Sequence, residues 1–260
     1  MAGISIGRVW DETWAFVRAE SALLLPVSLA TIGAAMLLLT QVIPDPVNDR
    51  LPRGPWLLWL IPVYALMLTG VIATTALALR PGTSVAESLQ LALRRLPMGG
   101  AVVMILAAMS VVASVPVALV SLVEMRGGGA PGALTGLANG AMLAVTVWLW
   151  VRLLPMWAVV AEGRPTPFAV LRDSFTLTRG VAGRLLGLAL IAVAGAVVVG
   201  AALLFSGGAV LMIVGRALGG AAMGALLVSI LMAILVAVAT TLWTVMIAFL
   251  YRHLAAARSA

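Results

Sequence analysis

An arginine inside a long apolar stretch is the residue of this chain whose chemistry most needs an explanation. Arg152 stands in the run WLWVRLLPMWAVVAEG, positions 148–163, with no acidic residue within one helical turn. An arginine at the centre of a membrane helix costs about 2.5–3.5 kcal/mol on insertion scales. We therefore expect its guanidinium to have either a partner or a route to the lipid headgroups.

Three explanations are open for Arg152. Its side chain could extend to the headgroups, with the neighbouring tryptophans forming an aromatic belt. It could form an ion pair with a carboxylate from another segment, for which the candidates are Asp173, Glu87 and Glu20. It could also bind an anion, above all a lipid phosphate, because the planar guanidinium binds phosphate oxygens in a bidentate way.

Polar residues after the apolar run extend this candidate site. They follow Glu162 and belong to the segment TPFAVLRDSFTLTRG, in which arginines interrupt the apolar face of an expected short helix. The candidate site for an ion pair or an anionic lipid headgroup consists of Arg152, Glu162, Arg172, Asp173, Ser174 and Arg179.

The sequence contains no pattern for a catalytic, metal or cofactor site. The chain has no cysteine and one histidine, His253, so thiolate chemistry and motifs with two histidines are excluded. We expect a protein that is not an enzyme and that uses no cofactor and no metal. The net charge is +7, but no basic run alternates with aromatic residues, so we expect no nucleic-acid partner.

Composition predicts the fold class, an all-α integral membrane protein with a single domain. Of the 260 residues, 63% are hydrophobic and 10% are charged, compared with about 25% charged in soluble domains. A membrane helix needs about 20 mostly apolar residues. Six transmembrane helices are predicted, at about 21–43, 55–79, 99–123, 138–161, 184–206 and 220–250.

Short amphipathic helices are predicted before the first, third and fifth spans, and we expect them to lie at the membrane surface. They cover residues 4–19, about 84–96 and about 167–179. The chain therefore has the layout of a threefold repeat of helix, span and span. The order of elements leaves open whether the repeat arose by true duplication.

The arginines predict the orientation in the membrane. Eleven of the 16 lie on the side of the two chain ends and four lie in the opposite loops, with Arg152 between them. The positive-inside rule places both termini in the cytoplasm.

Glycines at a spacing of four residues could allow helices to approach closely, within the chain or in a homo-oligomer or a complex with another membrane protein. The pairs are Gly136/Gly140, Gly183/Gly187, Gly215/Gly219 and Gly220/Gly224.

A signature over positions 152–191 resembles a known family. It combines a span that contains Pro155 and ends in Glu162-Gly163 with a short helix that carries Arg172, Ser174, Phe175, Leu177, Thr178 and Gly180. It is similar to the membrane domain associated with glycerophosphoryl diester phosphodiesterases and to YciC-type bacterial inner-membrane proteins. The resemblance implies a membrane fold in the bacterial inner membrane. It implies no phosphodiesterase activity, because those enzymes use paired histidines in a separate barrel of about 250 residues.

These observations favour a non-enzymatic protein that binds lipids, organises the membrane or binds a membrane partner. Membrane lipids, anionic phospholipid among them, are the expected ligands. The alternative is a transporter of a lipid-like or amphipathic substrate through a cytoplasm-facing cleft near Arg152 and Asp173. A continuous cavity lined by Arg152 would favour the transporter.

Overall fold

The predicted fold class is confirmed: the chain is an all-α polytopic membrane protein. The computed structural model describes residues 6–44, 54–126 and 132–259, and these residues contain no strand. Six segments of this part are long and apolar enough to cross a membrane. Residues 4 and 5 of the predicted first helix, together with Arg50 and Arg53, lie outside the described residues.

The first repeat unit begins with an amphipathic helix, α1 (Ile6–Ala19), as predicted. The first span then consists of three consecutive helical pieces, and α4 returns across the membrane. Gly70 of α4 lies against the π-helical piece, because a Cβ atom at this glycine would clash with Thr31 and Ile32. The bounds are α2 (Ser21–Ser28), η1 (Leu29–Gly33), α3 (Ala34–Val42) and α4 (Trp56–Leu79).

The second unit differs from the prediction, because its surface helix and its first span form one helix, α5 (Val85–Arg126). The prediction of two separate helices, at about 84–96 and 99–123, was wrong. The buried residues of both segments fall on one helical stripe, so both pack with the same face of a continuous helix. These residues are Ser88, Ala92, Gly99 and Val102.

The fourth span was predicted as one helix over 138–161 and consists of two, α6 (Ala133–Leu153) and α7 (Met156–Glu162). The interruption falls at Leu154 and Pro155. A proline has no backbone N–H and its ring clashes with the preceding turn, which explains the break at this place.

The third unit comprises α8 (Pro167–Leu177), α9 (Ala182–Gly219) and α10 (Ala221–Ser259). The helices α9 and α10 extend beyond the predicted spans, and Gly220 turns the chain between them with a φ of 85°. Gly215 lies directly against the backbone of Gly224. By contrast, a Cβ would meet nothing within 4 Å at the other predicted pairs, Gly136/Gly140 and Gly183/Gly187, so these glycines serve no close approach within the chain.

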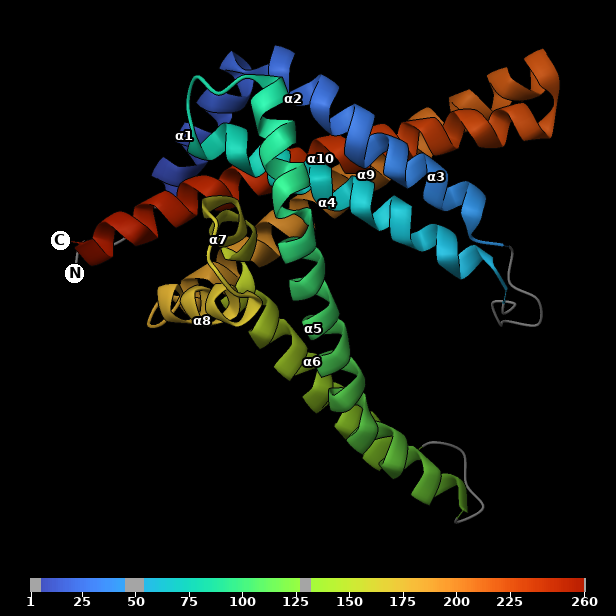
Figure 1. Cartoon of the computed structure of the whole chain (residues 1–260). Helices are drawn as coiled ribbons and strands as arrows, with labels where there is room; N and C mark the ends of the chain where they lie inside the picture. The colour runs from blue at the N-terminus through green and yellow to red at the C-terminus, as the bar shows by residue number, and fades with distance from the viewer. Residues whose placement is uncertain (1–5, 45–53, 127–131, 260) are drawn as a thin grey trace.

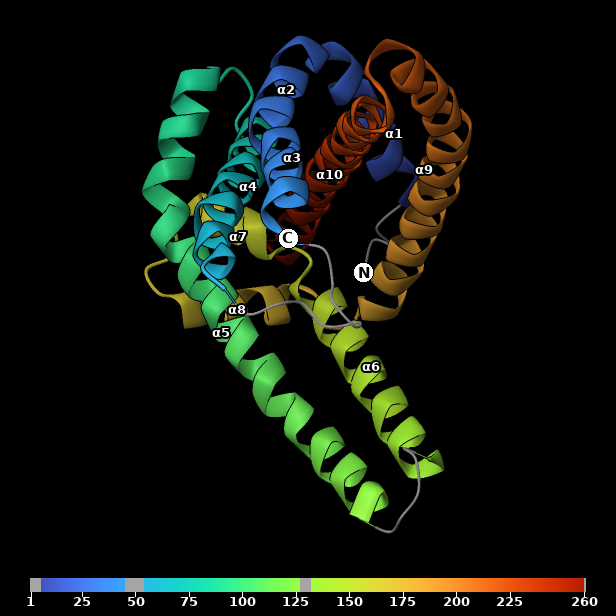
Figure 2. The same ribbon diagram turned by 90° about the vertical axis from the view of Figure 1, so that its right-hand side faces the viewer.

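Figure 1 shows how the helices are arranged. The helices α1 and α8, the α4–α5 turn and the C-terminal end of α10 lie on one side of the molecule, which we call the terminal face. Three hairpins, α3–α4, α5–α6 and α9–α10, extend away from it. In Figures 1 and 2 the α5–α6 hairpin points in a different direction from the other two.

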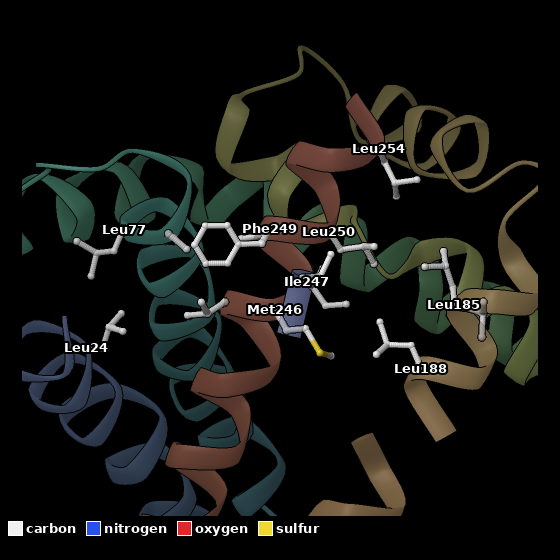
Figure 3. Packing of buried hydrophobic residues seen from close by; sticks show 14 residues of the cluster. Leu24, Leu77, Leu185, Leu188, Met246, Ile247, Phe249, Leu250 and Leu254 are labelled. Carbon is white, nitrogen blue, oxygen red and sulfur yellow. The ribbon is translucent and has the colours of Figure 1, made fainter. Parts of the chain in front are cut away.

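The core lies near the terminal face, where the hairpins converge. Figure 3 shows α10 at its centre, with Phe249 and Leu250 between α2 and α4 on one side and α9 on the other. Every residue of α10 from 244 to 251 is buried, whereas only 6% of the most apolar window of α5 and of α9 is buried. A helix that is buried on all sides must be apolar all round, and positions 245–250 of α10 are all apolar.

The helix α1 packs along α10 with Val9 and Thr13 buried, while the tryptophans on its edge remain exposed. His253 Nε2 of α10 lies 2.9 Å from the Glu12 carboxylate of α1. This hydrogen bond, with a smaller contribution from Arg8, holds the pKa of Glu12 below its ordinary value. The two ends of the described chain are therefore joined by a polar contact on the same face.

Candidate functional site

The structure divides the predicted site into two parts. Arg152 lies at the end of α6, beside the C-terminal half of α8. Glu162 and Asp173 belong to a second cluster, which joins the α7–α8 turn to α10. The six predicted residues therefore do not converge on one point, and the two parts have different chemistry.

Arg152 is half-buried in the last turn of α6, directly before the break at Pro155. Its guanidinium carbon lies 5.3 Å from the ring centroid of Trp148, within the range of a cation–π interaction. The Trp148 ring in turn packs against Phe175 of α8. The aromatic residues thus hold the guanidinium between α6 and α8.

The hydrogen bonding of this guanidinium is incomplete. Nη1 donates to the Phe175 carbonyl over 3.5 Å, which is long for a hydrogen bond, and Nε is buried without a partner. A buried donor without a partner costs about 1–3 kcal/mol, and more when it is charged. Among the described residues, Arg152 therefore lacks a strong acceptor.

The predicted ion pair of Arg152 is not formed. Asp173 pairs with Arg164 at 2.8 Å. Glu87 accepts the backbone N–H of Ser84 at 2.9 Å. Glu20 forms no ion pair with any described residue, and no described carboxylate pairs with Arg152. Asp173 and Glu87 have partners on their own segments, which explains why neither pairs with Arg152.

Two hydroxyl groups of the predicted signature have structural roles. The buried Ser174 hydroxyl donates to the Val170 carbonyl within α8, so this residue of the predicted site is not available to a ligand. The Thr178 hydroxyl lies 3.1 Å from the Arg152 carbonyl. It therefore links the end of α8 to the last turn of α6 and fixes the backbone that carries Arg152.

The second cluster joins three helices. The Tyr251 hydroxyl of α10 donates to the Glu162 carboxylate at the end of α7, over 2.5 Å. The Arg164–Asp173 ion pair closes the turn between α7 and α8. Each acid of this cluster therefore has an internal partner, and we assign the cluster to the architecture of the terminal face.

Gly163 completes this turn. Its φ of 94° is a left-handed conformation that favours glycine, and its N–H caps the end of α7. The space of a missing side chain is filled by the guanidinium of Arg95 from α5. A cation at this position also suits the negative end of the α7 helix dipole.

The remaining arginines of the predicted site are exposed. Arg172 and Arg179 form no ion pair in the part of the chain that the structure describes. The region around α8 thus has its acids neutralised internally and keeps Arg152, Arg172 and Arg179 without a carboxylate. It is suited to an anion and not to a cation. No three His, Asp or Glu side chains among the described residues lie together as a metal site would need.

Neither of the two best-defined cavities is lined by Arg152. The smaller one, of about 20 Å³, lies beside the break of the fourth span between α4, α7 and α10. The larger one, of about 350 Å³, lies at the α4–α5 turn. The cavity at Arg152 that would favour a transporter is not one of them.

Sequence reasoning missed two residues that complete the second cluster, Arg95 and Tyr251. Both come from helices distant in the sequence, α5 and α10. The signal that could have found Arg95 is the glycine after Glu162, because a glycine at a helix end often makes room for a neighbour.

Comparisons of this chain with models of protein families, with curated proteins and with solved structures find no match.

Proposed function

We propose that this chain is a non-enzymatic membrane protein that holds the phosphate of an anionic phospholipid at Arg152. The observation that carries the proposal is the guanidinium of Arg152, which is half-buried and has no strong acceptor. A phosphate oxygen supplies the charged acceptor that this group lacks, and hydrogen bonds between charged partners are short and strong.

The surroundings of Arg152 support a lipid as the source of this phosphate. Trp148 and Trp150 of α6 expose about half of their surface or more, with values of 51% and 60%. Tryptophans are enriched where lipid headgroups meet the hydrocarbon core. Arg179, next in sequence to the Thr178 anchor, adds an exposed cation to the half-buried Arg152.

The resemblance to the membrane domain associated with glycerophosphoryl diester phosphodiesterases is consistent with this role, and we propose the same family for this chain. Its signature residues have structural tasks here: Pro155 breaks the span, Gly163 turns the chain and Thr178 anchors Arg152. We further propose that the protein resides in a bacterial inner membrane with both termini in the cytoplasm.

Native mass spectrometry of the protein extracted in a maltoside detergent tests the lipid site. We expect an anionic phospholipid to remain bound to the wild type and to be lost from Arg152→Gln. The matched control is Arg216→Gln, which removes an exposed arginine in the last turn of α9. Arg152→Lys keeps the charge without the planar fork, so reduced retention there attributes binding to the guanidinium.

Equal lipid retention by the wild type and both Arg152 variants would overturn the proposal. Thermal unfolding of each variant, measured in the same detergent, separates a lost lipid from a lost fold.

A further inference from the structure

An open groove lies at the α4–α5 turn, apart from every residue of the site around Arg152. Its volume is about 350 Å³, within the range of about 300–1,000 Å³ that small-molecule sites occupy. It follows directly on the end of the second span, at the terminal face (Figure 1). Its lining consists of Arg80, Thr83, Glu87, Gln90, Leu91 and Arg94.

The groove presents two arginines without internal partners. Arg80 and Arg94 are exposed, and neither side chain forms an ion pair with a described residue. The one acid, Glu87, is held by the cap of α5, where its carboxylate accepts the Ser84 N–H at 2.9 Å. The two guanidinium groups and the Glu87 carboxylate together give the groove a net charge of one positive unit.

The α7–α8 turn has a similar sequence pattern, but its arginine is paired within the protein. Both turns contain Arg-Pro before a helix capped by a hydroxyl, with the arginine four residues before Ser84 in one turn and two residues before Thr166 in the other. Seven residues after the cap, α8 carries Asp173, which neutralises the arginine of its own turn. The same register position in α5 is Leu91.

We propose that the groove at the α4–α5 turn binds a phosphodiester monoanion between Arg80 and Arg94. A single negative charge matches the net charge of the lining, and the planar guanidinium fork suits phosphate oxygens. The Gln90 amide is a further donor in the groove. The Thr83 hydroxyl already donates to the Arg80 carbonyl at 2.8 Å, so it is not a donor for the ligand.

A phosphodiester monoanion can come from the headgroup of phosphatidylglycerol or from a soluble compound, and two titrations separate these sources. Delipidated full-length protein in maltoside detergent is titrated with phosphatidylglycerol, and in parallel with glycerophosphoglycerol, which has no acyl chains. Native mass spectrometry gives the dissociation constants. Tight binding of phosphatidylglycerol alone identifies a lipid site, and equal binding of glycerophosphoglycerol identifies a soluble ligand.

Substitutions then locate the site. We expect the pair Arg80→Gln and Arg94→Gln to weaken phosphodiester binding about tenfold or more, since each removes a hydrogen bond from a charged donor. Arg216→Gln, at the far end of α9, should leave the affinity unchanged. Arg152→Gln removes a different site, so its effect should add to that of the pair.

Leu91→Asp is the sharpest variant, because it keeps both arginines and introduces the acid that α8 has at this register. We expect Leu91→Asp to abolish binding and Leu91→Asn, of the same size but neutral, to retain it. If the paired arginine variant and Leu91→Asp both bind phosphatidylglycerol and glycerophosphoglycerol as the wild type does, the proposal is wrong, whatever the result at Arg152.

Discussion

The α4–α5 and α7–α8 turns have a similar local design and opposite chemistry. Each contains Arg-Pro, a glycine with positive φ and a helix with a hydroxyl cap, with the glycine after Arg-Pro in the α4–α5 turn and before it in the α7–α8 turn. The α7–α8 turn satisfies its charges internally through Asp173, Tyr251 and Arg95. In the α4–α5 turn, Arg80 is exposed and lines an open groove.

From this difference we propose that the partner of an arginine, and not the arginine itself, decides whether such a turn is structural or binds a ligand. An internally paired guanidinium has little left to offer a ligand. An unpaired one at the membrane surface attracts phosphate. The following predictions measure how far the two turns differ.

The largest effect is expected from alanine at Gly163, and Gly82 of the other turn serves as its comparison. Gly163 and Gly82 have φ values of 94° and 84°, so an alanine at either should cost about 1–2 kcal/mol in left-handed strain. Gly163→Ala must also displace Arg95, whereas a Cβ at Gly82 meets nothing within 4 Å. We expect Gly163→Ala to lower the free energy of unfolding in detergent by more than Gly82→Ala. Equal losses would show that Arg95 does not hold the turn.

A second effect is expected at the contact between α10 and α7. Tyr251→Phe removes the hydrogen bond to the Glu162 carboxylate and should lower the free energy of unfolding by about 1.5–3 kcal/mol. The control is Tyr64→Phe, because Tyr64 is exposed and donates to no described residue. If Tyr251→Phe is as stable as Tyr64→Phe, the hydrogen bond between Tyr251 and Glu162 does not stabilise the fold.

A smaller difference in the free energy of unfolding is expected between substitutions of the two turn arginines, Arg164 and Arg80. Arg164 and Asp173 are partly exposed, with 46% and 34% of their side chains accessible. A double-mutant cycle of Arg164→Gln and Asp173→Asn should therefore give a coupling of about 0.2–1 kcal/mol. Arg80→Gln should leave the stability unchanged, since Arg80 pairs with no described acid. A stability loss from Arg80→Gln as large as that from Arg164→Gln would erase the contrast between the turns.

The smallest effect is a pH dependence of the contact between α1 and α10, which is the hydrogen bond between Glu12 and His253. The pKa of Glu12 is lowered in the folded protein, chiefly by the hydrogen bond with His253. A lowered pKa adds stability above the ordinary value of 4.5, and this contribution is lost as the pH falls through the folded value. Protease digestion of the N-terminal segment should become faster over this acidic range in the wild type. In Glu12→Gln the rate should not change there, and a matching acidic step in this variant would exclude Glu12 as its source.

Much of the fold could be predicted from the sequence, because the length and apolarity of a segment decide whether it crosses a membrane. The six spans and the amphipathic α1 follow from these properties. The fusion of the second surface helix with its span could not be predicted, since it depends on which face of α5 is buried. The interruption at Pro155 was not predicted, because a lone proline more often bends a helix than ends it.

Less of the candidate site could be predicted. Arg152 stood out because a charge in an apolar run is expensive, and that signal is local. An ion pair was one of three explanations left open for it, and none of the candidate acids pairs with it, because the choice of partner depends on tertiary contacts. Asp173 pairs with Arg164, and Glu87 accepts the backbone N–H of Ser84.

The central claim is that Arg152, which pairs with no described acid, binds lipid phosphate and that Arg164, which pairs with Asp173, does not. The most direct measurement is the magnetic dipolar coupling between guanidinium ¹⁵N and lipid ³¹P, recorded on the labelled protein in phosphatidylglycerol bilayers. Arg152→Gln and Arg164→Gln assign the two signals. The account predicts strong coupling to phosphorus at Arg152 and none at Arg164. Coupling that is absent at Arg152, or equal at the two arginines, would contradict it.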